Sequence, residues 1–329
     1  MIRKKIPIKI FIALILAVSV SLSAAAAEML APVGRTTGIK LYADGAVVIK
    51  ICDDIANNPA SQAGISVGDT IKSANGKKIY SNADLKKAIE KNGEKEMEIV
   101  YERNGSEKTA KVKPVKNEKG EVCIGVWIRD SIAGIGTITY YDPKSGKYGA
   151  LGHGICDSEA GTLIPVSHGA LMNSSVEGVN KGKAGSPGEL VGEYDLSHDT
   201  ADIIKNCDSG IFGTFKDGKA FEGLKCYPAA KKEEIKRGKA KILSNLNGTD
   251  VEEYEIEITA IYLDGENTKN MLIRATDPRL IEKTGGIVRG MSGSPIIQDG
   301  KLIGAVTHVL INDPQKGYAV FIENMLKEQ

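Results

Sequence analysis

The segment from Gly290 to Pro295 reads Gly-Met-Ser-Gly-Ser-Pro and places a serine hydroxyl on a turn of small residues. Glycine on either side allows a sharp turn, so we expect Ser292 and its neighbouring N–H groups to be unobstructed. Two apolar runs follow, joined by Asp299-Gly300, a pair typical of tight β-hairpins. Such a serine can act as a nucleophile. A purely structural turn is the alternative.

The Gly-x-Ser-Gly-x-Pro pattern resembles the nucleophile motif of chymotrypsin-type proteases. The resemblance implies that the N–H groups of Gly290 and Ser292 form an oxyanion hole. Such proteases also need a general base. His153 lies in Leu-Gly-His-Gly after an apolar run, so its imidazole is accessible between two glycines. In two-barrel proteases the base comes from the first barrel and the nucleophile from the second, and His153 fits this order. His308 competes only if the hairpin folds back toward Ser292. We therefore predict His153 as the base.

The imidazole needs a third group that accepts its N–H and fixes its tautomer. Chemistry alone leaves four candidates. Asp199 and Asp202 follow His153 at the spacing usual in such proteases, Asp208 lies in Asn-Cys-Asp-Ser-Gly, and Asp277 precedes the serine in Thr-Asp-Pro.

Composition describes an ordinary globular protein of two or three domains, with 329 residues, 42% hydrophobic and 26% charged. The formal net charge of +1 and the lack of a basic stripe argue against nucleic-acid binding. Five scattered cysteines form no Cys-x-x-Cys pair, so neither a disulfide framework nor a zinc ribbon is expected. We expect no metal and no cofactor.

The N-terminus has the pattern of a secretory signal. Lys4, Lys5 and Lys9 precede an apolar run from Ile10 to Val20, and small residues follow. A positive segment, an apolar segment and an Ala-x-Ala-like site are typical of signal peptides. The run is short for a membrane span, although retention as an anchor is the alternative. We expect residues 1–27 to be a signal peptide or membrane anchor, and the remainder to work outside the cytosol.

Residues 33–116 predict a small α+β domain. Strands are expected at 39–42, 46–51, 96–103 and 108–115, with a helix over 83–91 capped by Asn82. Between them stands Pro-Ala-Ser-Gln-Ala-Gly-Ile-Ser-Val-Gly-Asp-Thr-Ile, followed by Asn-Gly. This run resembles the PDZ domains of bacterial exported proteases. The resemblance implies that an extended peptide adds as a strand beside the helix, with a carboxylate-binding loop at Gly38 and Ile39. A domain of this shape without a ligand is the alternative.

Residues 121–329 are rich in short strands and glycine turns, and a polar linker is expected just before them. Regularly spaced short strands predict a barrel or sandwich. Together with the resemblances of the serine motif and of residues 33–116, this implies a mainly β fold: a chymotrypsin-like double β-barrel protease domain preceded by a small α+β PDZ domain.

The whole chain resembles the stage IV sporulation protein B serine peptidase family. The resemblance rests on the secretory N-terminus, the PDZ-like domain, Leu151-Gly152-His153-Gly154 and the run from Thr284 to Pro295, which contains Gly-Gly-Ile-Val-Arg-Gly-Met-Ser-Gly-Ser-Pro. It implies a catalytic set of Ser292, His153 and Asp277, and so favours Asp277 among the four carboxylates. The region before the PDZ domain is shorter than the family pattern.

The family further implies a signalling protease exported to the space between the two forespore membranes. There it would cleave a regulatory protein that restrains an intramembrane metalloprotease, and so trigger the processing of pro-sigma-K during sporulation. It would also cleave itself, and its PDZ domain would guide self-recognition and substrate targeting. The implied partners are the protein substrate, a second copy of the chain and a peptide ligand of the PDZ domain.

Two other functions are compatible with parts of the sequence. One is a non-enzymatic exported PDZ adaptor with a protease-like scaffold, against which the Ser292, His153 and Asp277 set argues. The other is a metal-dependent hydrolase that uses His153, Cys156 and Asp157. It lacks an obvious further ligand, and the chain has no His-Glu-x-x-His run.

Overall fold

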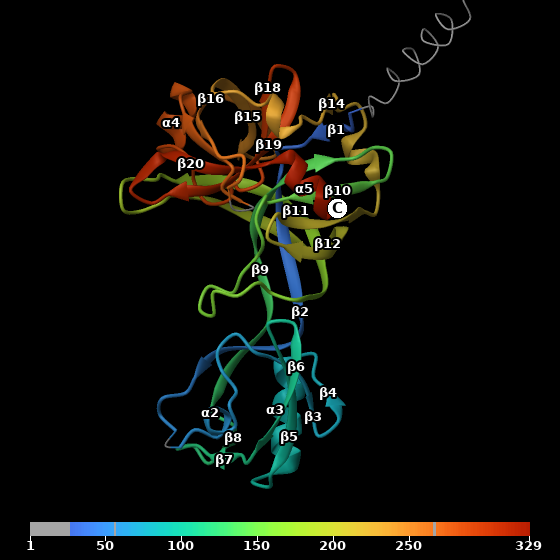
Figure 1. Cartoon of the computed structure of the whole chain (residues 1–329), viewed down its shortest axis with the longest axis vertical. Coiled ribbons are helices and arrows are strands. Elements are labelled where there is room, and N and C mark those ends of the chain that lie inside the picture. Colours follow the sequence, from blue (N-terminus) through green and yellow to red (C-terminus); the bar gives the residue numbers. More distant parts are fainter. Residues whose placement is uncertain (1–26, 56, 266–267) are drawn as a thin grey trace, which may run out of the picture.

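The computed structural model describes residues 27–55, 57–265 and 268–329. The leader expected over residues 1–27 lies outside these ranges except for Ala27. Within them, no helix is both long and apolar enough to cross a membrane. Figure 1 shows a large lobe and a small lobe joined by two long strands, β2 (Thr36–Ile51) and β9 (Val126–Tyr141), which we call the interlobe strands.

The C-terminal half of the large lobe is a closed barrel of six strands. In barrel order they are β15 (Gly238–Asn247), β16 (Asp250–Ile261), β17 (Met271–Ala275), β20 (Asp313–Phe321), β19 (Lys301–Leu310) and β18 (Pro295–Gln298). Asp299 and Gly300 have φ of 49° and 77° and join β18 to β19, so the expected hairpin is confirmed. Ile242, Ile256 and Ile273 are at most 1% exposed and belong to the core of this barrel.

The other half of the large lobe is a second ring of six strands. β9 pairs with β10 (Lys147–Ala150), and the ring continues through β13 (Gly210–Phe215), β12 (Glu189–Cys207), β11 (Val166–Asn180) and β2, which pairs again with β9. Leu41, Leu171 and Tyr148 are fully buried inside it. The expected double β-barrel is therefore confirmed.

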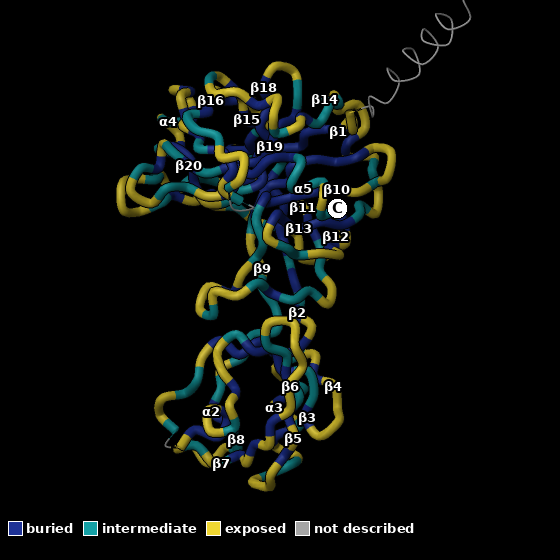
Figure 2. The backbone as a smooth tube through the Cα atoms, in the orientation of Figure 1, coloured by how far each residue is buried: buried dark blue, intermediate teal, exposed yellow. Residues whose placement is uncertain are grey.

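The small lobe is an α+β unit with its own core. Its strands are β3 (Thr70–Ala74), β4 (Lys77–Lys78), β5 (Met97–Arg103) and β6 (Ser106–Val112), beside α2 (Pro59–Gln62), α3 (Asn82–Asn92), β7 (Val115–Lys116) and β8 (Val122–Cys123). Leu85 and Ile89 of α3 pack into this core, which Figure 2 shows as separate from the large lobe's buried interior. The N-cap of α3 is Ser81, whose hydroxyl accepts from Asp84 N, and not Asn82 as expected.

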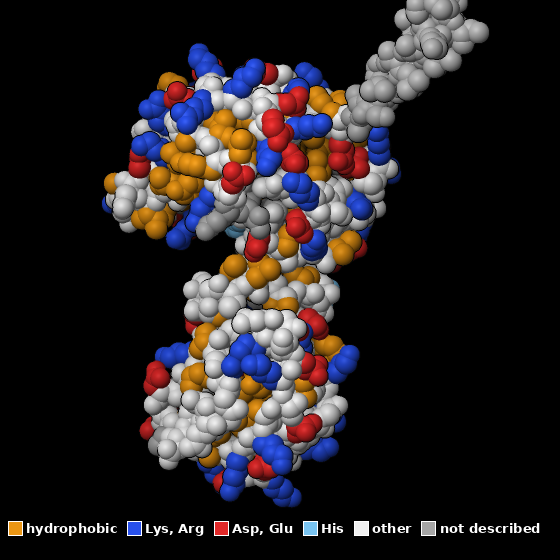
Figure 3. All heavy atoms as spheres, in the orientation of Figure 1, with side chains coloured by type: hydrophobic (Ala, Val, Ile, Leu, Met, Phe, Trp, Pro, Cys, Tyr) orange, Lys and Arg blue, Asp and Glu red, His pale blue; other side chains and the backbone are white. Residues whose placement is uncertain are grey.

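Shorter elements complete the large lobe. They are β1 (Met29–Pro32), η1 (Gly218–Phe221), β14 (Tyr227–Pro228), η2 (Lys232–Glu234), α4 (Pro278–Thr284) and α5 (Ile322–Glu328). Charged side chains of both signs are mixed over the face of both lobes in Figure 3.

The interlobe strands make the small lobe an insertion within the first barrel. β2 and β9 pair from Thr36↔Thr137 in the large lobe to Ile51↔Val126 in the small lobe, with an irregularity between Tyr42 and Val47. Residues 36–43 of β2 therefore belong to the first barrel before the chain enters the small lobe. The domain limits expected at 33–116 and 121–329 stay a prediction, and the structure adds that two continuous strands run through both parts.

A buried amide links the two barrels. Asn245 on β15 is fully buried, and its Oδ1 accepts the Thr36 hydroxyl of β2 at 2.6 Å. Its Nδ2 donates to the carbonyls of Asn247, Gly248 and Asp250 at 2.9–3.2 Å. Both ends of the buried amide are thus satisfied by hydrogen-bond partners within the protein.

We expect Asn245→Leu to lower the free energy of unfolding by about 1–3 kcal/mol, because it leaves buried polar groups without partners. Urea unfolding measures the change. The control is Asn247→Leu on the same strand, where the side chain is exposed, and it should unfold like the wild type. Equal stability of Asn245→Leu and wild type would contradict the role assigned to this amide.

Candidate active site

Ser292 stands on a turn that only glycine can build. Gly290 and Gly293 have φ of 93° and 98°, in the left-handed region. A Cβ on Gly293 would lie 2.0 Å from Thr137 O and 2.6 Å from Leu151 N, so backbone from the first barrel fills that space. Ser292 is half-buried, whereas Ser294 is fully buried and its hydroxyl donates to Ser244 Oγ. The turn therefore leaves Ser292 partly accessible to solvent and buries Ser294.

Thr137 of β9 holds this turn against the first barrel. Its N–H donates to Ser292 O at 3.0 Å, and its hydroxyl donates to Gly290 O at 2.7 Å. Its own carbonyl accepts from Leu151 N at 3.1 Å. One fully buried residue thus fixes the serine turn and the start of the histidine loop at once. We did not predict Thr137 from the sequence, because nothing distinguishes it from other strand residues.

His153 follows two residues in left-handed backbone. Leu151 and Gly152 both have φ of 69°, a costly conformation for leucine that surrounding structure must impose. The imidazole donates through Nδ1–H to Gly154 O at 2.9 Å. This hydrogen bond leaves Nε2 unprotonated in the neutral ring, which is the form that can accept a proton.

Ser292 and His153 line the same cavity, of about 310 Å³. Its walls are mostly apolar, with Ile39, Ile135 and Leu151 among them, and Arg289 stands at its edge. The Ser292 hydroxyl donates to Thr307 O at 2.6 Å, so it must turn away from that carbonyl before His153 can take its proton. Catalytic hydrogen bonds in unliganded enzymes often form only with substrate.

The oxyanion hole expected at Gly290 and Ser292 stays a prediction with a favourable geometry. Within the described part of the chain, neither N–H donates a hydrogen bond to a protein atom. The turn therefore leaves both donors open beside the hydroxyl, as a developing oxyanion requires.

His308 is the residue next to the carbonyl that Ser292 contacts. Its ring centroid lies 4.8 Å from that of His153, with the planes tilted by 36°. Desolvation, with smaller effects from His153 and Lys269, lowers the pKa of His308 to about 4. Desolvation also lowers the pKa of His153 below its usual 6.5, against the opposing effect of the Gly154 carbonyl. Both rings are therefore neutral at pH 7.

The structure does not bring Asp277 to His153. Asp277 is the N-cap of α4, where Oδ1 accepts from Arg279 N at 2.9 Å and Oδ2 accepts from Glu255 N at 3.2 Å. Arg279 Nη2 donates to the same carboxylate at 3.0 Å and holds its pKa below the usual value. Asp277 lines a cavity with acidic residues of β16, and His153 is not part of that cavity.

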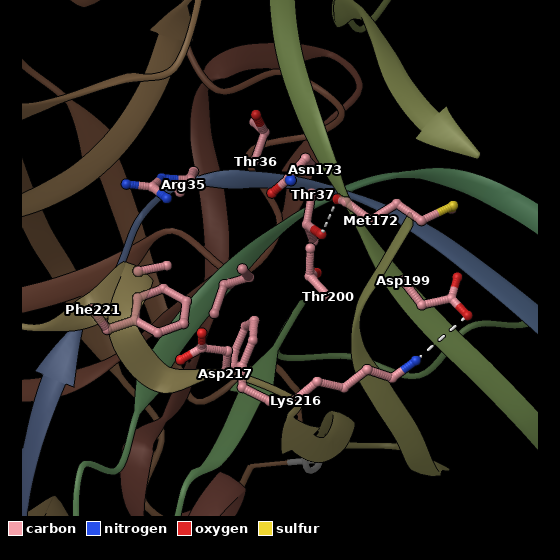
Figure 4. Close-up of a pocket in the computed structure, with 13 residues that line it drawn as sticks. Arg35, Thr36, Thr37, Met172, Asn173, Asp199, Thr200, Lys216, Asp217 and Phe221 are labelled. Carbon is pink, nitrogen blue, oxygen red and sulfur yellow. Dashed lines mark hydrogen bonds and ion pairs between the residues drawn. The ribbon is translucent and has the colours of Figure 1, made fainter. Parts of the chain in front are cut away.

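Of the other three carboxylates, one lies near His153. Asp199 and Asp202 face Lys216 at 3.7 and 3.5 Å, and Asp199 lines a separate cavity of about 310 Å³ (Figure 4). Asp208 lines a cavity of about 430 Å³ together with His153 and His308. From the sequence, Asp208 was one of four undecided candidates. Only the structure shows that Asp208 and His153 line the same cavity.

Gly38 and Ile39 do not form a peptide-binding loop beside α3. Both lie inside the first barrel, where β2 pairs with β11 on one side and β9 on the other. A strand paired on both sides has no edge for an added peptide. Ile39 instead lines the cavity with Ser292. The cavity beside α3, of about 470 Å³, is lined from the other side by residues 121–124 and 126–128.

The metal-ligand set considered from the sequence is not assembled, because Asp157 is engaged elsewhere. Asp157 is 1% exposed and accepts from Arg129 Nη1 at 2.6 Å, so its carboxylate is already engaged. In the described ranges no group of three His, Cys, Asp or Glu side chains is arranged to hold a metal ion. All five cysteines are unpaired thiols.

We expect Asp277→Asn to react with a fluorophosphonate at nearly the wild-type rate, because its carboxylate caps a helix. The change should lower stability, and Asp277→Ala more so, by about 1 kcal/mol. Removal of an orienting carboxylate costs about 10⁴ in kcat in trypsin. A folded Asp277→Asn protein that has lost reactivity to that extent would restore Asp277 to the catalytic set.

The pH dependence follows from the lowered pKa of His153. Only the neutral imidazole can act as the base. As the pH is lowered, the rate of fluorophosphonate labelling should therefore stay at its maximum past pH 6.5 and fall only when His153 becomes protonated at a lower pH. Stopped-time labelling across pH 4–8, with mass spectrometry of the adduct, measures the midpoint. A midpoint at or above the ordinary value of 6.5 would contradict the burial seen here.

Among curated proteins, the chain is similar to two proteases. The "Probable protease eep" of Enterococcus faecalis is 38% identical over 71 residues, which are 22% of this chain and 17% of that protein. The "Regulator of sigma-W protease RasP" of Bacillus subtilis is 29% identical over 148 residues, which are 44% of this chain and 31% of that protein. The chain thus spans less than a third of either relative.

Among solved structures, one match is the PDZ domain of the SdrC-like protein from Listeria monocytogenes, 23% identical, covering 26% of this chain and 87% of that one, with a TM-score of 0.23. Another is the Rv3671c protease from M. tuberculosis in its active form, 17% identical, covering 60% and 72%, with a TM-score of 0.32. Two family models match the sequence directly: a PDZ domain over residues 25–113 and SpoIVB peptidase S55 over residues 120–326. Because the second match covers more than half of the chain, the chain belongs to the SpoIVB peptidase S55 family.

Proposed function

We propose that the chain is an exported serine endopeptidase in which Ser292 is the nucleophile and His153 the base. Membership of the S55 peptidase family supports a serine peptidase. The observation that carries the assignment of residues is the shared cavity of Ser292 and His153, to which the serine turn and the histidine loop are tied by Thr137. Catalysis needs that pairing held to a fraction of an ångström.

The chemistry proceeds in two balanced steps. Ser292 Oγ attacks the substrate carbonyl while His153 Nε2 takes the hydroxyl proton, and the N–H groups of Gly290 and Ser292 hold the oxyanion. The C–N bond then breaks, and His153 gives the proton to the leaving amine. Water repeats the sequence on the ester and releases the acid and free Ser292.

The His153 N–H is held by the Gly154 carbonyl in this proposal, with Asp208 as the nearby carboxylate. A backbone carbonyl fixes the tautomer as a carboxylate would, although it stabilises the imidazolium less. The family resemblance implied Asp277 in this role instead, and the Asp277→Asn experiment decides between the two assignments.

The substrate lies extended along β9. β2 pairs with one edge of residues 131–136 of β9, and no strand of the described chain pairs with the other edge there. Residues 132–135 line the cavity of Ser292, and Ala133 and Gly134 are exposed. A peptide that adds to this edge brings its main-chain carbonyls toward the serine, with little demand on its sequence.

The small lobe binds a second segment of peptide. A PDZ domain implies peptide binding, and the cavity between α3 and residues 121–128 offers apolar walls for it. Trp127, 62% exposed, stands at this cavity. This cavity replaces the Gly38 and Ile39 loop as the proposed peptide site.

We further propose the biological role that the family resemblance implies. The enzyme would be exported through the signal at residues 1–27 to the forespore intermembrane space, associate with the membrane at least transiently, cleave a regulatory protein and itself, and trigger the processing of pro-sigma-K. The similarity to RasP, whose name describes a regulator of sigma-W protease, fits a role in the control of a sigma factor. The alternative remains a PDZ adaptor with a protease-like scaffold.

We expect Ser292→Ala to abolish peptide cleavage and fluorophosphonate labelling while the protein stays folded. Ser294→Ala, two residues away and buried, should retain labelling with some loss of stability. The measurement is adduct mass after incubation of residues 28–329, with mapping of all new chain ends. Labelling of Ser292→Ala, or a folded Ser294→Ala that is inert, would overturn the assignment. A folded wild type that takes no label and cleaves nothing would favour the adaptor.

A further inference from the structure

We propose that β9 couples the peptide cavity of the small lobe to the catalytic loop, through the neighbouring side chains of Asp130 and Arg129. The proposal rests on the function proposed above and adds a means of regulating the same site. β9 runs from one lobe to the other in Figure 1. Val126, Trp127 and Ile128 line the peptide cavity, and residues 132–135 line the cavity of Ser292.

Asp130 ties β9 to the helix of the peptide cavity. Its Oδ2 accepts from Asn82 N at 2.8 Å, at the first residue of α3. The N–H of Asn82 has no partner within the helix, because it lies in the first turn. The hydrogen bond to Asp130 is charge-assisted, and the helix dipole stabilises a carboxylate at this end. Because Leu85 and Ile89 of α3 line the peptide cavity, a ligand that moves the helix acts directly on Asp130.

Arg129, the next residue, ties β9 to the loop that carries the catalytic histidine. Its Nη1 donates to Asp157 Oδ2 at 2.6 Å, and its Nη2 donates to Glu159 Oε1 at 3.2 Å. Asp157 is 1% exposed, whereas the Arg129 side chain is 29% exposed. A buried carboxylate loses far more from an absent partner than an exposed one, so this pair constrains the loop strongly.

The anchored loop is short and stiff between Asp157 and His153. Asp157 Oδ1 also accepts from the N–H groups of Glu159 and Ala160, both at 2.9 Å. Closer to His153, Ile155 is held at both its N–H and its carbonyl by the Asn206 amide of β12. The loop that Arg129 contacts is therefore restrained along its length. A displacement of Arg129 moves Asp157, and through the loop it moves the imidazole of His153, four residues before Asp157.

Adjacent residues on a strand point to opposite faces, so one strand holds α3 on one side and the histidine loop on the other. A rotation or slide of β9 that relaxes one contact strains the other. The two cavities are thereby linked, and Arg129 and Asp157 are positioning residues for His153. Coupling between two sites acts in both directions, so occupation of the catalytic site must also change the conformation of the peptide cavity.

The reciprocity gives a test on the full chain that needs no knowledge of the peptide. Trp127 is the only tryptophan and reports from the peptide cavity. Diisopropyl fluorophosphate is the probe: Ser292 Oγ bonds to phosphorus, fluoride leaves and His153 takes the hydroxyl proton. We expect labelling to change the Trp127 emission of the wild type. Ser292→Ala treated in the same way should show no change.

Arg129→Met should uncouple the two cavities. We expect its labelling rate to fall by up to about 100-fold, the cost of misplacing a catalytic group by about 1 Å. The emission change on labelling should vanish, whereas Arg129→Lys should retain part of both. The matched control is Arg274→Met, which removes a surface pair with Glu257 on the second barrel and should behave like the wild type. Asp157→Asn should reproduce Arg129→Met, and the double variant should be no worse than either single one.

The outcomes separate this proposal from the function on which it rests. If mass spectrometry shows no adduct on the wild type, the proposed peptidase site is wrong. If the adduct forms, yet Trp127 emission does not change and Arg129→Met labels at the wild-type rate, the site stands and the coupling is wrong. If Arg129→Met slows labelling but preserves the emission change, Arg129 only stabilises the loop, and this too overturns the coupling.

Discussion

The catalytic half of this protein depends on one buried threonine. Thr137 gives its N–H to Ser292 O and its hydroxyl to Gly290 O, and it takes the Leu151 N–H on its carbonyl. These three bonds join the serine turn of the second barrel to the histidine loop of the first. They also explain why Gly293 must be glycine, since a Cβ there would meet Thr137 O at 2.0 Å. The proposed active site thus lies between the two barrels, and Thr137 fixes the spacing between its two loops.

That residue lies on the strand that also enters the small lobe. Because β2 and β9 pair with each other in both lobes, on either side of an irregularity between Tyr42 and Val47, the small lobe is built into the wall of the first barrel and not attached through a single linker. A tethered domain would influence only which substrates reach the serine. A domain that shares two strands with the barrel is placed to influence the geometry of the serine and histidine as well.

The electrostatics of the site favour a neutral histidine pair. His153 and His308 pack ring against ring, and burial lowers the pKa of both. A neutral base is ready at ordinary pH, although a buried imidazolium formed during reaction needs compensation from its surroundings. The Gly154 carbonyl and the Asp208 carboxylate at the same cavity are the groups placed to provide it.

Much of the local structure around Ser292 could be predicted from the sequence, because short-range rules govern it. Small residues around Ser292 predicted an exposed hydroxyl, and the hairpin at Asp299-Gly300 followed from the φ values that this pair favours. Strand spacing predicted a barrel or sandwich, and the resemblance of the serine motif to known proteases implied the double barrel and the family. These features depend on residues within a few positions of each other, so no tertiary information was needed.

Long-range pairing was decided only by the tertiary structure. Asp277 matched a family motif, but its neighbours Arg279 and Glu255 hold it at the start of α4. Gly38 and Ile39 looked like the entrance to the small domain, yet pairing on both sides places them within the first barrel. Local pattern predicts that a segment is a strand, but not which strands lie beside it. The role of Thr137 and the link from Arg129 to Asp157 depend on that choice of neighbours, which is fixed by the packing of the whole chain.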